Sequence, residues 1–199
     1  MPRYREQDLY PEEVGKTTVE GLAATFEAYV VEARRLQAKY RDQIEIIVGA
    51  ETENIYGDSI AQVRELRDRH HLEYLVGSVH HVNEVPIDFS KEMFQQAVEK
   101  AGGLDRLFEG YYDAQYQLVV EVRPEVVGHF DLVNMFCVDH PISLAVEEKI
   151  RRSIAHAVSY GALFELNASA FRKSLPGAHP QANVVKVSFP LPLSLLKPL

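Results

Sequence analysis

Cysteine is scarce in this sequence, and long apolar runs are absent. Cys137 is the single cysteine, which excludes an internal disulfide framework and fits a reducing compartment. No run reaches the roughly 18 apolar residues of a membrane-spanning helix. The first residues, MPRYREQD, have no apolar core to serve as a signal peptide. We therefore expect a soluble, cytoplasmic protein.

Basic residues are also too few to give the chain a positive face. The formal net charge is −8 and the sequence pI is about 5.5. Nucleic acids and anionic membranes both require a basic surface, so we expect neither as a partner. The 199 residues, 46% of them hydrophobic, can bury one sizeable core, and a single domain is the simplest expectation. The oligomeric state stays open.

Short apolar runs alternate with segments of helical periodicity. We expect strands over 44–50, 73–80, 125–131 and 162–167, and helices over 17–40, 58–70, 90–102, 104–122 and 143–159. Thr17 and Glu20 have the spacing of a capping box, and Asp58 can cap the second helix. Connections of this length favour parallel pairing, which indicates an α/β fold. From residue 184 to the end we find no periodicity.

Polar side chains follow the ends of these expected strands. Glu51 follows the first strand, His80 the second and His129 the third, while Glu165 and Asn167 end the fourth. Because the carboxyl ends of parallel strands meet at one rim, we expect these residues to lie close together. A carboxylate with two imidazoles suits a divalent metal such as Zn, Mn or Fe, and three ligands leave a position for water.

The histidines also have plainer interpretations. Strand alternation allows only one of His80 and His81 to point inward; we assign His80 to the metal and His81 to the substrate or to a supporting role. Glu53, two residues after Glu51 and hence on the same face, is either a supporting group of the site or, more simply, a solvated side chain. His70 and His71, at a helix end, are interpreted as solvated or as compensating the helix dipole. His140, His156 and His179 have no partner pattern and are interpreted as structural.

A phosphate site is suggested by the cations after the fourth strand. Arg172 and Lys173 follow Asn167, and a guanidinium can bind phosphate with two parallel hydrogen bonds. An ordinary basic helix start explains the same residues equally well. Arg3 and Arg5 are weaker candidates for the same role.

Five segments together resemble a known family. They are LYPEE at 9–13, VGAETE at 48–53, GSVHHVNEVPIDF at 77–89, GHFDLV at 128–133 and ELNASAFRK at 165–173. They resemble the histidinol-phosphatase branch of the PHP (polymerase and histidinol phosphatase) superfamily, in its fungal form, over about residues 1–185. The resemblance implies a distorted seven-stranded (β/α) barrel with a metal cluster, often of three ions, at the carboxyl ends of the strands. It also implies hydrolysis of L-histidinol phosphate, a small phosphate monoester, in histidine biosynthesis.

The resemblance assigns roles to individual residues. Glu51, His80 and His129 match metal ligands of the catalytic centre, with Glu51 as a bridge between two ions. The residues expected to bind the substrate are His81, Asp88, Asn167 and Arg172.

Two family motifs have no match, the H-x-H of the first strand and the D-x-H of the last. We therefore expect an incomplete barrel, with residues 1–185 as one truncated PHP-type domain and 186–199 as an atypical tail. Impaired activity is expected, and the alternative is a non-catalytic remnant that binds one metal or phosphate ligand. A PHP-type phosphoesterase acting on nucleic acid is disfavoured by the negative charge.

Overall fold

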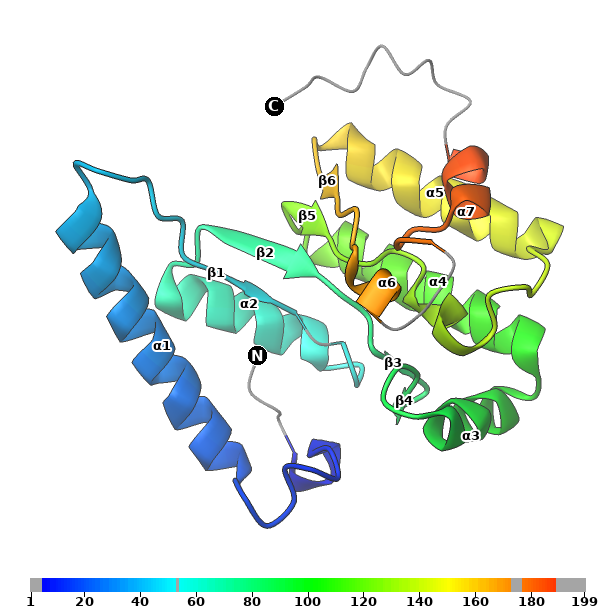
Figure 1. Cartoon of the computed structure of the whole chain (residues 1–199), viewed down its shortest axis with the longest axis horizontal. Coiled ribbons are helices and arrows are strands. Elements are labelled where there is room, and N and C mark those ends of the chain that lie inside the picture. Colours follow the sequence, from blue (N-terminus) through cyan, green and yellow to red (C-terminus); the bar gives the residue numbers. More distant parts are fainter. Residues whose placement is uncertain (1–4, 53, 173–176, 189–199) are drawn as a thin grey trace.

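A parallel sheet of four strands lies at the centre of the computed structural model, which describes residues 5–52, 54–172 and 177–188 (Figure 1). The sheet has the order β1-β2-β5-β6, formed by β1 (Gly49–Glu51), β2 (Tyr74–Gly77), β5 (Val126–Val127) and β6 (Leu163–Phe164). All neighbouring strands pair in parallel. The expected α/β fold with a parallel sheet is therefore confirmed.

Helices connect and cover these strands. They are α1 (Val19–Tyr40), α2 (Ser59–His70), α3 (Lys91–Ala101), α4 (Leu104–Glu121), α5 (Leu144–Ser159), α6 (Ser169–Arg172) and α7 (Ala182–Ser188). Short 3-10 helices, η1 (Glu6–Asp8) and η2 (Leu132–Phe136), and an antiparallel hairpin, β3 (His81–Val82) with β4 (Val85–Pro86), complete the order. Among the described residues, no helix is both long and apolar enough to cross a bilayer.

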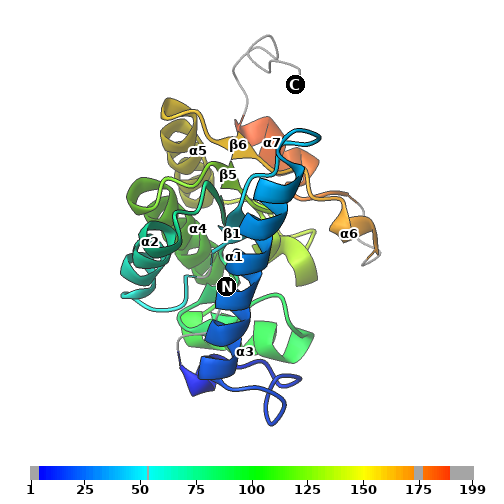
Figure 2. The same ribbon diagram turned by 90° about the vertical axis from the view of Figure 1, so that its left-hand side faces the viewer.

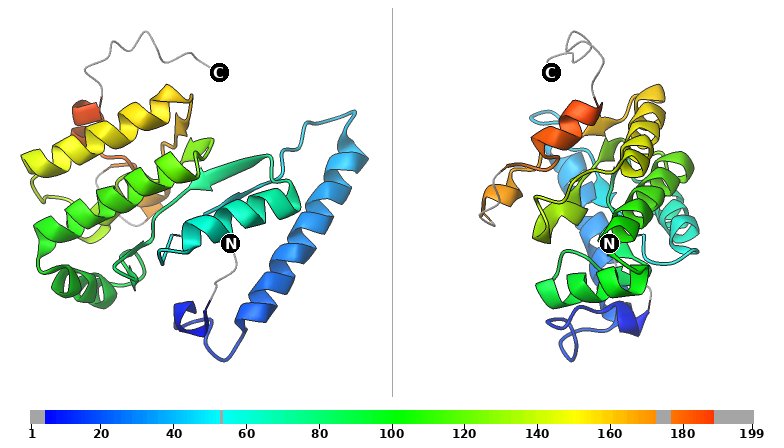
Figure 3. Two further views of the ribbon diagram at one scale, coloured as in Figure 1. Left: turned by 180° about the vertical axis from the view of Figure 1, so that it is seen from behind. Right: turned by 90° about the vertical axis from the view of Figure 1, so that its right-hand side faces the viewer.

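Three of these helices share one face of the sheet. Figure 2 shows α2, α4 and α5 on one side of the strands and α6 and α7 on the other, and Figure 3 shows the same arrangement from behind. The core between sheet and helices contains fully buried apolar side chains such as Leu75, Leu118, Val127 and Ile150. Each large apolar side chain buried in this way contributes about 1.5–3 kcal/mol. This packing holds the strands, and therefore their carboxyl ends, in fixed positions.

The helix starts follow local side-chain chemistry. Ser90 and Ser143 cap α3 and α5, because each hydroxyl accepts a backbone N–H three residues later, from Met93 and Val146. The expected box at Thr17 is wrong by one residue, since Thr18 accepts the N–H of Gly21 at 3.1 Å. Asp58 precedes α2 as expected but makes no capping hydrogen bond.

The first strand is shorter than expected. The sequence predicts a strand over 44–50, but β1 spans only Gly49–Glu51. Side chains take the backbone groups that a neighbouring strand would need: Gln37 Nε2 donates to the carbonyl of Ile46, and Glu73 accepts the N–H of Val48. Ile44 and Ile47 are consequently exposed. The prediction for 44–48 is wrong because these side chains compete for the backbone.

The sequence also misses α7, and it places a tail boundary inside that helix. The helix spans Ala182–Ser188, whereas the expected tail begins at residue 186. Residues 189–199 of that tail lie outside the described residues.

Candidate metal centre

Three neighbouring strands each deliver one ligand-type side chain to the same edge of the sheet. Glu51 is the last residue of β1, His80 lies three residues after β2, and His129 lies two residues after β5. The parallel register pairs Glu51 with Val76 and Val127 with Gly77, so the strands end at the same level. The structure thus brings together three residues of which the first, Glu51, and the last, His129, are 78 positions apart in the chain.

The distances among the three are short. Glu51 Oε1 lies 3.0 Å from His129 Nε2 and 3.5 Å from His80 Nε2, and the two Nε2 atoms are 3.2 Å apart. A tetrahedral zinc with Zn–N distances near 2.0–2.1 Å would hold its ligand atoms about 3.3 Å apart. The observed separations therefore fit one divalent ion, and Glu51, His80 and His129 form a possible metal site.

Access to this site is from the side of the carboxylate. The side chain of Glu51 is 48% exposed, whereas those of His80 and His129 are 13% and 11% exposed. The imidazoles are held by the fold, and the glutamate faces solvent. An ion here would have an open side for water or a small substrate.

The local charge favours a cation. Hydrogen bonds from His129 and then His80 hold the pKa of the Glu51 carboxyl well below its usual value, and burial opposes this shift. The Ser78 hydroxyl lowers the same pKa. Glu51 is therefore an anion at neutral pH, as a divalent metal requires of a carboxylate ligand.

Comparison with known protein families identifies the domain that contains this site. The model of the family described as "PHP domain" matches residues 13–169. This chain belongs to the PHP domain family.

The similar curated proteins share one activity in their names. This PHP domain chain is 46% identical over 192 residues to the "Probable histidinol-phosphatase" of Schizosaccharomyces pombe, an alignment covering 94% of this chain and 62% of that protein. It is 28% identical over 228 residues to the "Histidinol-phosphatase" of Saccharomyces cerevisiae, covering 94% and 67%. A Bacillus subtilis "Histidinol-phosphatase" is 26% identical over 168 residues, covering 77% and 62%. The chain therefore spans 62% of the length of its fission-yeast relative.

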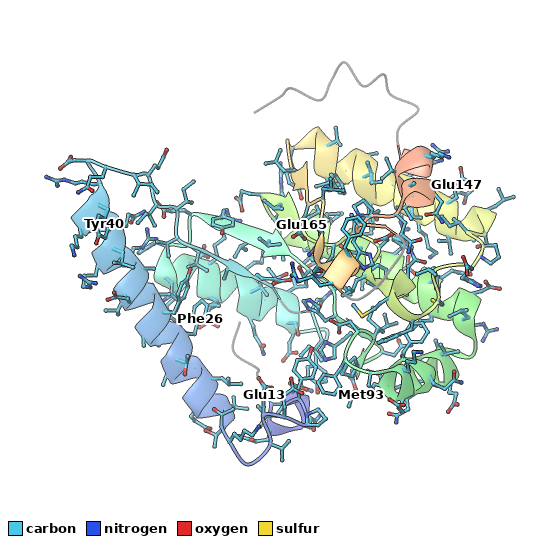
Figure 4. The ribbon with its side chains drawn as sticks, viewed as in Figure 1. Glu13, Phe26, Tyr40, Met93, Glu147 and Glu165 are labelled. Carbon is cyan, nitrogen blue, oxygen red and sulfur yellow. The ribbon has the colours of Figure 1, made fainter. Side chains whose placement is uncertain are left out.

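Other hydrogen bonds hold the candidate ligands of this PHP domain in place. The backbone N–H of His129 donates to Glu165 Oε2 at 2.9 Å, and its carbonyl accepts from the N–H of Leu132 at 2.9 Å. Glu165 lies beside the carboxyl end of β6 (Figure 4). The sequence places Glu165 at the rim, and the structure shows that its carboxylate binds backbone there. The carbonyl of His80 accepts the N–H of Ile87 at 2.9 Å.

His81 and Asp88 belong to the loop and hairpin that follow His80. The ring of His81 is buried and stacks on Tyr10 with centroids 6.3 Å apart, and Tyr10 stacks on Phe89 at 5.2 Å. Asp88 lies close enough to Tyr111 to influence its hydroxyl electrostatically. The structure does not group either residue with the three candidate ligands, and their substrate roles stay predictions.

The residues after β6 are partly used by the fold. Asn167 exchanges two backbone hydrogen bonds with His179 and accepts the N–H of Ser169 through its side chain. Arg172 ends α6 with an exposed side chain. Lys173, Arg3 and Glu53 lie outside the described residues. Arg5 is engaged elsewhere, with its guanidinium 3.5 Å above the ring of Tyr56.

Of the two interpretations of His70, the solvated one is wrong, whereas its place in the last turn of α2 agrees with compensation of the helix dipole. His70 is not solvated: its side chain is buried, lies 3.2 Å from Glu27 Oε1 and packs edge-on against Phe26. Burial of the Phe26 face of α1 against the end of α2 explains this position. His71 ends α2 in the left-handed conformation and is exposed. The histidines interpreted as structural contact fold residues: His140 bonds Asp105, His156 packs against Tyr116, and His179 bonds Asp131.

Proposed function

We propose that this chain is a metal-dependent phosphoric monoester hydrolase that cleaves L-histidinol phosphate to L-histidinol and phosphate in cytoplasmic histidine biosynthesis. The observation that carries the proposal is the convergence of Glu51, His80 and His129 at distances of 3.0–3.5 Å. The substrate comes from the names of the fungal relatives, of which this chain spans 62% and 67%. We also infer that the four parallel strands are part of a distorted, incomplete (β/α) barrel of the PHP type.

The bound ion and the residues that hold it would have different roles in the reaction. A bound divalent ion supplies a Lewis acid and a nucleophilic water near neutral pH. The carboxylate of Glu51 and the Nε2 atoms of His80 and His129 would hold that ion, with zinc, manganese or iron all compatible with this donor set. The nearly buried imidazoles of His80 and His129 would hold the ion from one side, and the exposed side of Glu51 would leave room for the phosphate.

Other residues of the chain would orient the substrate. Arg172 is exposed after β6 and can offer phosphate two parallel hydrogen bonds from its guanidinium, and Asn167, five residues earlier, is the second proposed contact on this segment. His81 and Asp88, on the hairpin beside His80, are the proposed contacts for the histidinol part. Hydrolysis transfers the water oxygen to phosphorus, breaks the ester P–O bond and leaves the proton on the histidinol oxygen.

The test measures phosphate release from L-histidinol phosphate by the full chain, supplied in turn with Mn²⁺, Zn²⁺ and Fe²⁺. We expect slow release that a chelator abolishes. His129→Ala and His80→Ala should each lower kcat/KM at least about 100-fold, because each removes one ligand of the ion. His156→Ala is the matched control, since its ring packs against Tyr116 and Tyr160, away from the ligand cluster.

The outcomes separate the two functions that the sequence leaves open. A chain that binds a metal but releases no phosphate would contradict the proposed reaction and support the non-catalytic metal-binding remnant. Equal loss of activity in His156→Ala would contradict the assignment of the site.

A further inference from the structure

Ser78 is a fully buried polar residue that lies next to the candidate metal site. It directly follows β2 and lies two residues before His80. Its backbone N–H donates to Thr52 Oγ1 at 2.9 Å, and Thr52 directly follows Glu51. Its hydroxyl Oγ donates to Glu51 Oε1 at 2.7 Å. The end of β2 is thus joined to the end of β1 by both the backbone and the side chain of one serine.

The place of this hydroxyl is fixed by its neighbours. A Cβ added to Gly128 would lie 2.6 Å from Ser78 Oγ and 2.9 Å from Val76 Cγ1. The absence of a side chain at Gly128, immediately before His129, therefore opens the space that the hydroxyl occupies. Because the oxygen is enclosed on this side and bonded to Glu51 on the other, it has one position available.

The hydrogen bond also orients the carboxylate. An ionised carboxylate oxygen has two lone pairs, and the Ser78 hydroxyl occupies one of those on Glu51 Oε1. The same oxygen lies 3.0 Å and 3.5 Å from the Nε2 atoms of His129 and His80. Without the serine, only the two imidazoles, at 3.0 Å and 3.5 Å, would be left to hold a side chain that is 48% exposed.

We propose that Ser78 is a positioning residue of the metal centre, whose hydroxyl holds Glu51 Oε1 toward the two histidines and so raises the affinity for a divalent cation. The inference rests on the metal centre of the proposed function and adds Ser78, which lies within the segment 77–89 but to which the resemblance assigns no role. Groups that hydrogen-bond to metal ligands typically account for 10- to 100-fold in metal affinity.

The test is Ser78→Ala in the full chain, stripped of metal and titrated with Mn²⁺, with free Mn²⁺ counted by its electron paramagnetic resonance signal. We expect Kd to rise about 10- to 100-fold. Ser153→Ala is the matched control, because Ser153 is also fully buried but its hydroxyl donates to the carbonyl of Lys149 within α5. Its Kd should stay within about twofold of the unchanged chain.

Two further variants separate positioning from a general effect on the fold. In a Glu51→Ala background, Ser78→Ala should cause no additional loss of affinity, because the serine acts through that carboxylate. Ser78→Cys keeps a side chain of similar shape with a weaker donor. Its Kd for Mn²⁺ should lie between that of the unchanged chain and that of Ser78→Ala. This variant also decides the matter if Ser78→Ala fails to fold.

Each remaining outcome counts against the inference. An equal loss with and without Glu51 would show that Ser78 acts through the fold and would overturn it. Mn²⁺ binding by the unchanged chain and by Ser78→Ala with the same Kd would overturn it while leaving the proposed metal centre intact. No Mn²⁺ binding by the unchanged chain would overturn both.

Discussion

The negative charge of the candidate site comes from one carboxylate, that of Glu51. Glu51 accepts hydrogen bonds from two imidazoles and a serine hydroxyl, and its pKa is held below its usual value chiefly by His129 and then His80. Its ionisation at neutral pH does not depend on a bound metal. The site is therefore already charged for a cation when the chain folds.

The first prediction concerns acid stability of the metal-free chain. Because the folded pKa of Glu51 is lowered, its contribution to stability is present above its unfolded value, about 4.3, and is lost as the pH falls through the folded pKa. Urea unfolding curves should show the unchanged chain losing more stability between pH 5 and pH 3 than Glu51→Gln does. Parallel losses in both proteins would contradict the hydrogen-bonded role of Glu51.

The strands of this domain depend on glycine for close approach between elements. Glycines at or near three strands lie close to other side chains: Gly49 faces the ring of Tyr74, Gly77 faces Pro124, and Gly128 faces Ser78. At Gly77 the nearest atom, Pro124 Cγ, lies only 2.4 Å from where a Cβ would be. The proline ring is closed onto its own backbone nitrogen and cannot rotate away, so the segment before β5 would have to move to make room.

The second prediction is that Gly77→Ala destabilises the fold by about 1–3 kcal/mol through overpacking. Gly57→Ala is the matched control, because an added Cβ there has no heavy atom of the described residues within 4 Å and its backbone is not left-handed. It should be neutral or stabilising by up to about 1 kcal/mol. Urea unfolding of both variants measures the difference, and similar midpoints for the two would show that the β2–β5 junction adjusts freely.

Across the whole molecule, one buried polar pair joins the last described segment to the loop after β5. His179 Nδ1 lies 2.5 Å from Asp131 Oδ1, and both side chains are almost completely buried. Asp131 Oδ2 also accepts the backbone N–H of Gln181 at 2.6 Å. Residues 177–188, including α7, are therefore attached to the chain next to His129.

The third prediction is that His179→Ala destabilises the chain by about 3–5 kcal/mol, because it leaves the Asp131 carboxylate buried without its imidazole partner. His140→Asn is the comparison, since His140 pairs with the exposed Asp105, and exposed pairs contribute about 0–1 kcal/mol. Chemical denaturation gives both values. A loss under about 1 kcal/mol for His179→Ala would show that α7 is held without the His179–Asp131 pair.

Helix positions were predictable because their determinants are local. Ser90 and Ser143 lie one residue before α3 and α5, and each bonds a backbone N–H within the first turn. Strand lengths were less predictable, because a strand depends on which groups reach its edge from elsewhere. Gln37 lies nine residues before Ile46, and Glu73 lies 25 residues after Val48, yet their side chains bond the backbone of this segment.

The sequence by itself determined the chemical types that end each strand: a glutamate after the first and histidines after the second and third. These residue types, and the family resemblance that depends on them, can be recognised from segments of a few residues. Only the tertiary structure decided that Oε1 of Glu51 faces both imidazoles, that Glu165 binds the backbone of His129, and that Ser78 fills the space beside Gly128. These contacts join strands that are distant in the chain, and their geometry depends on strand order and core packing.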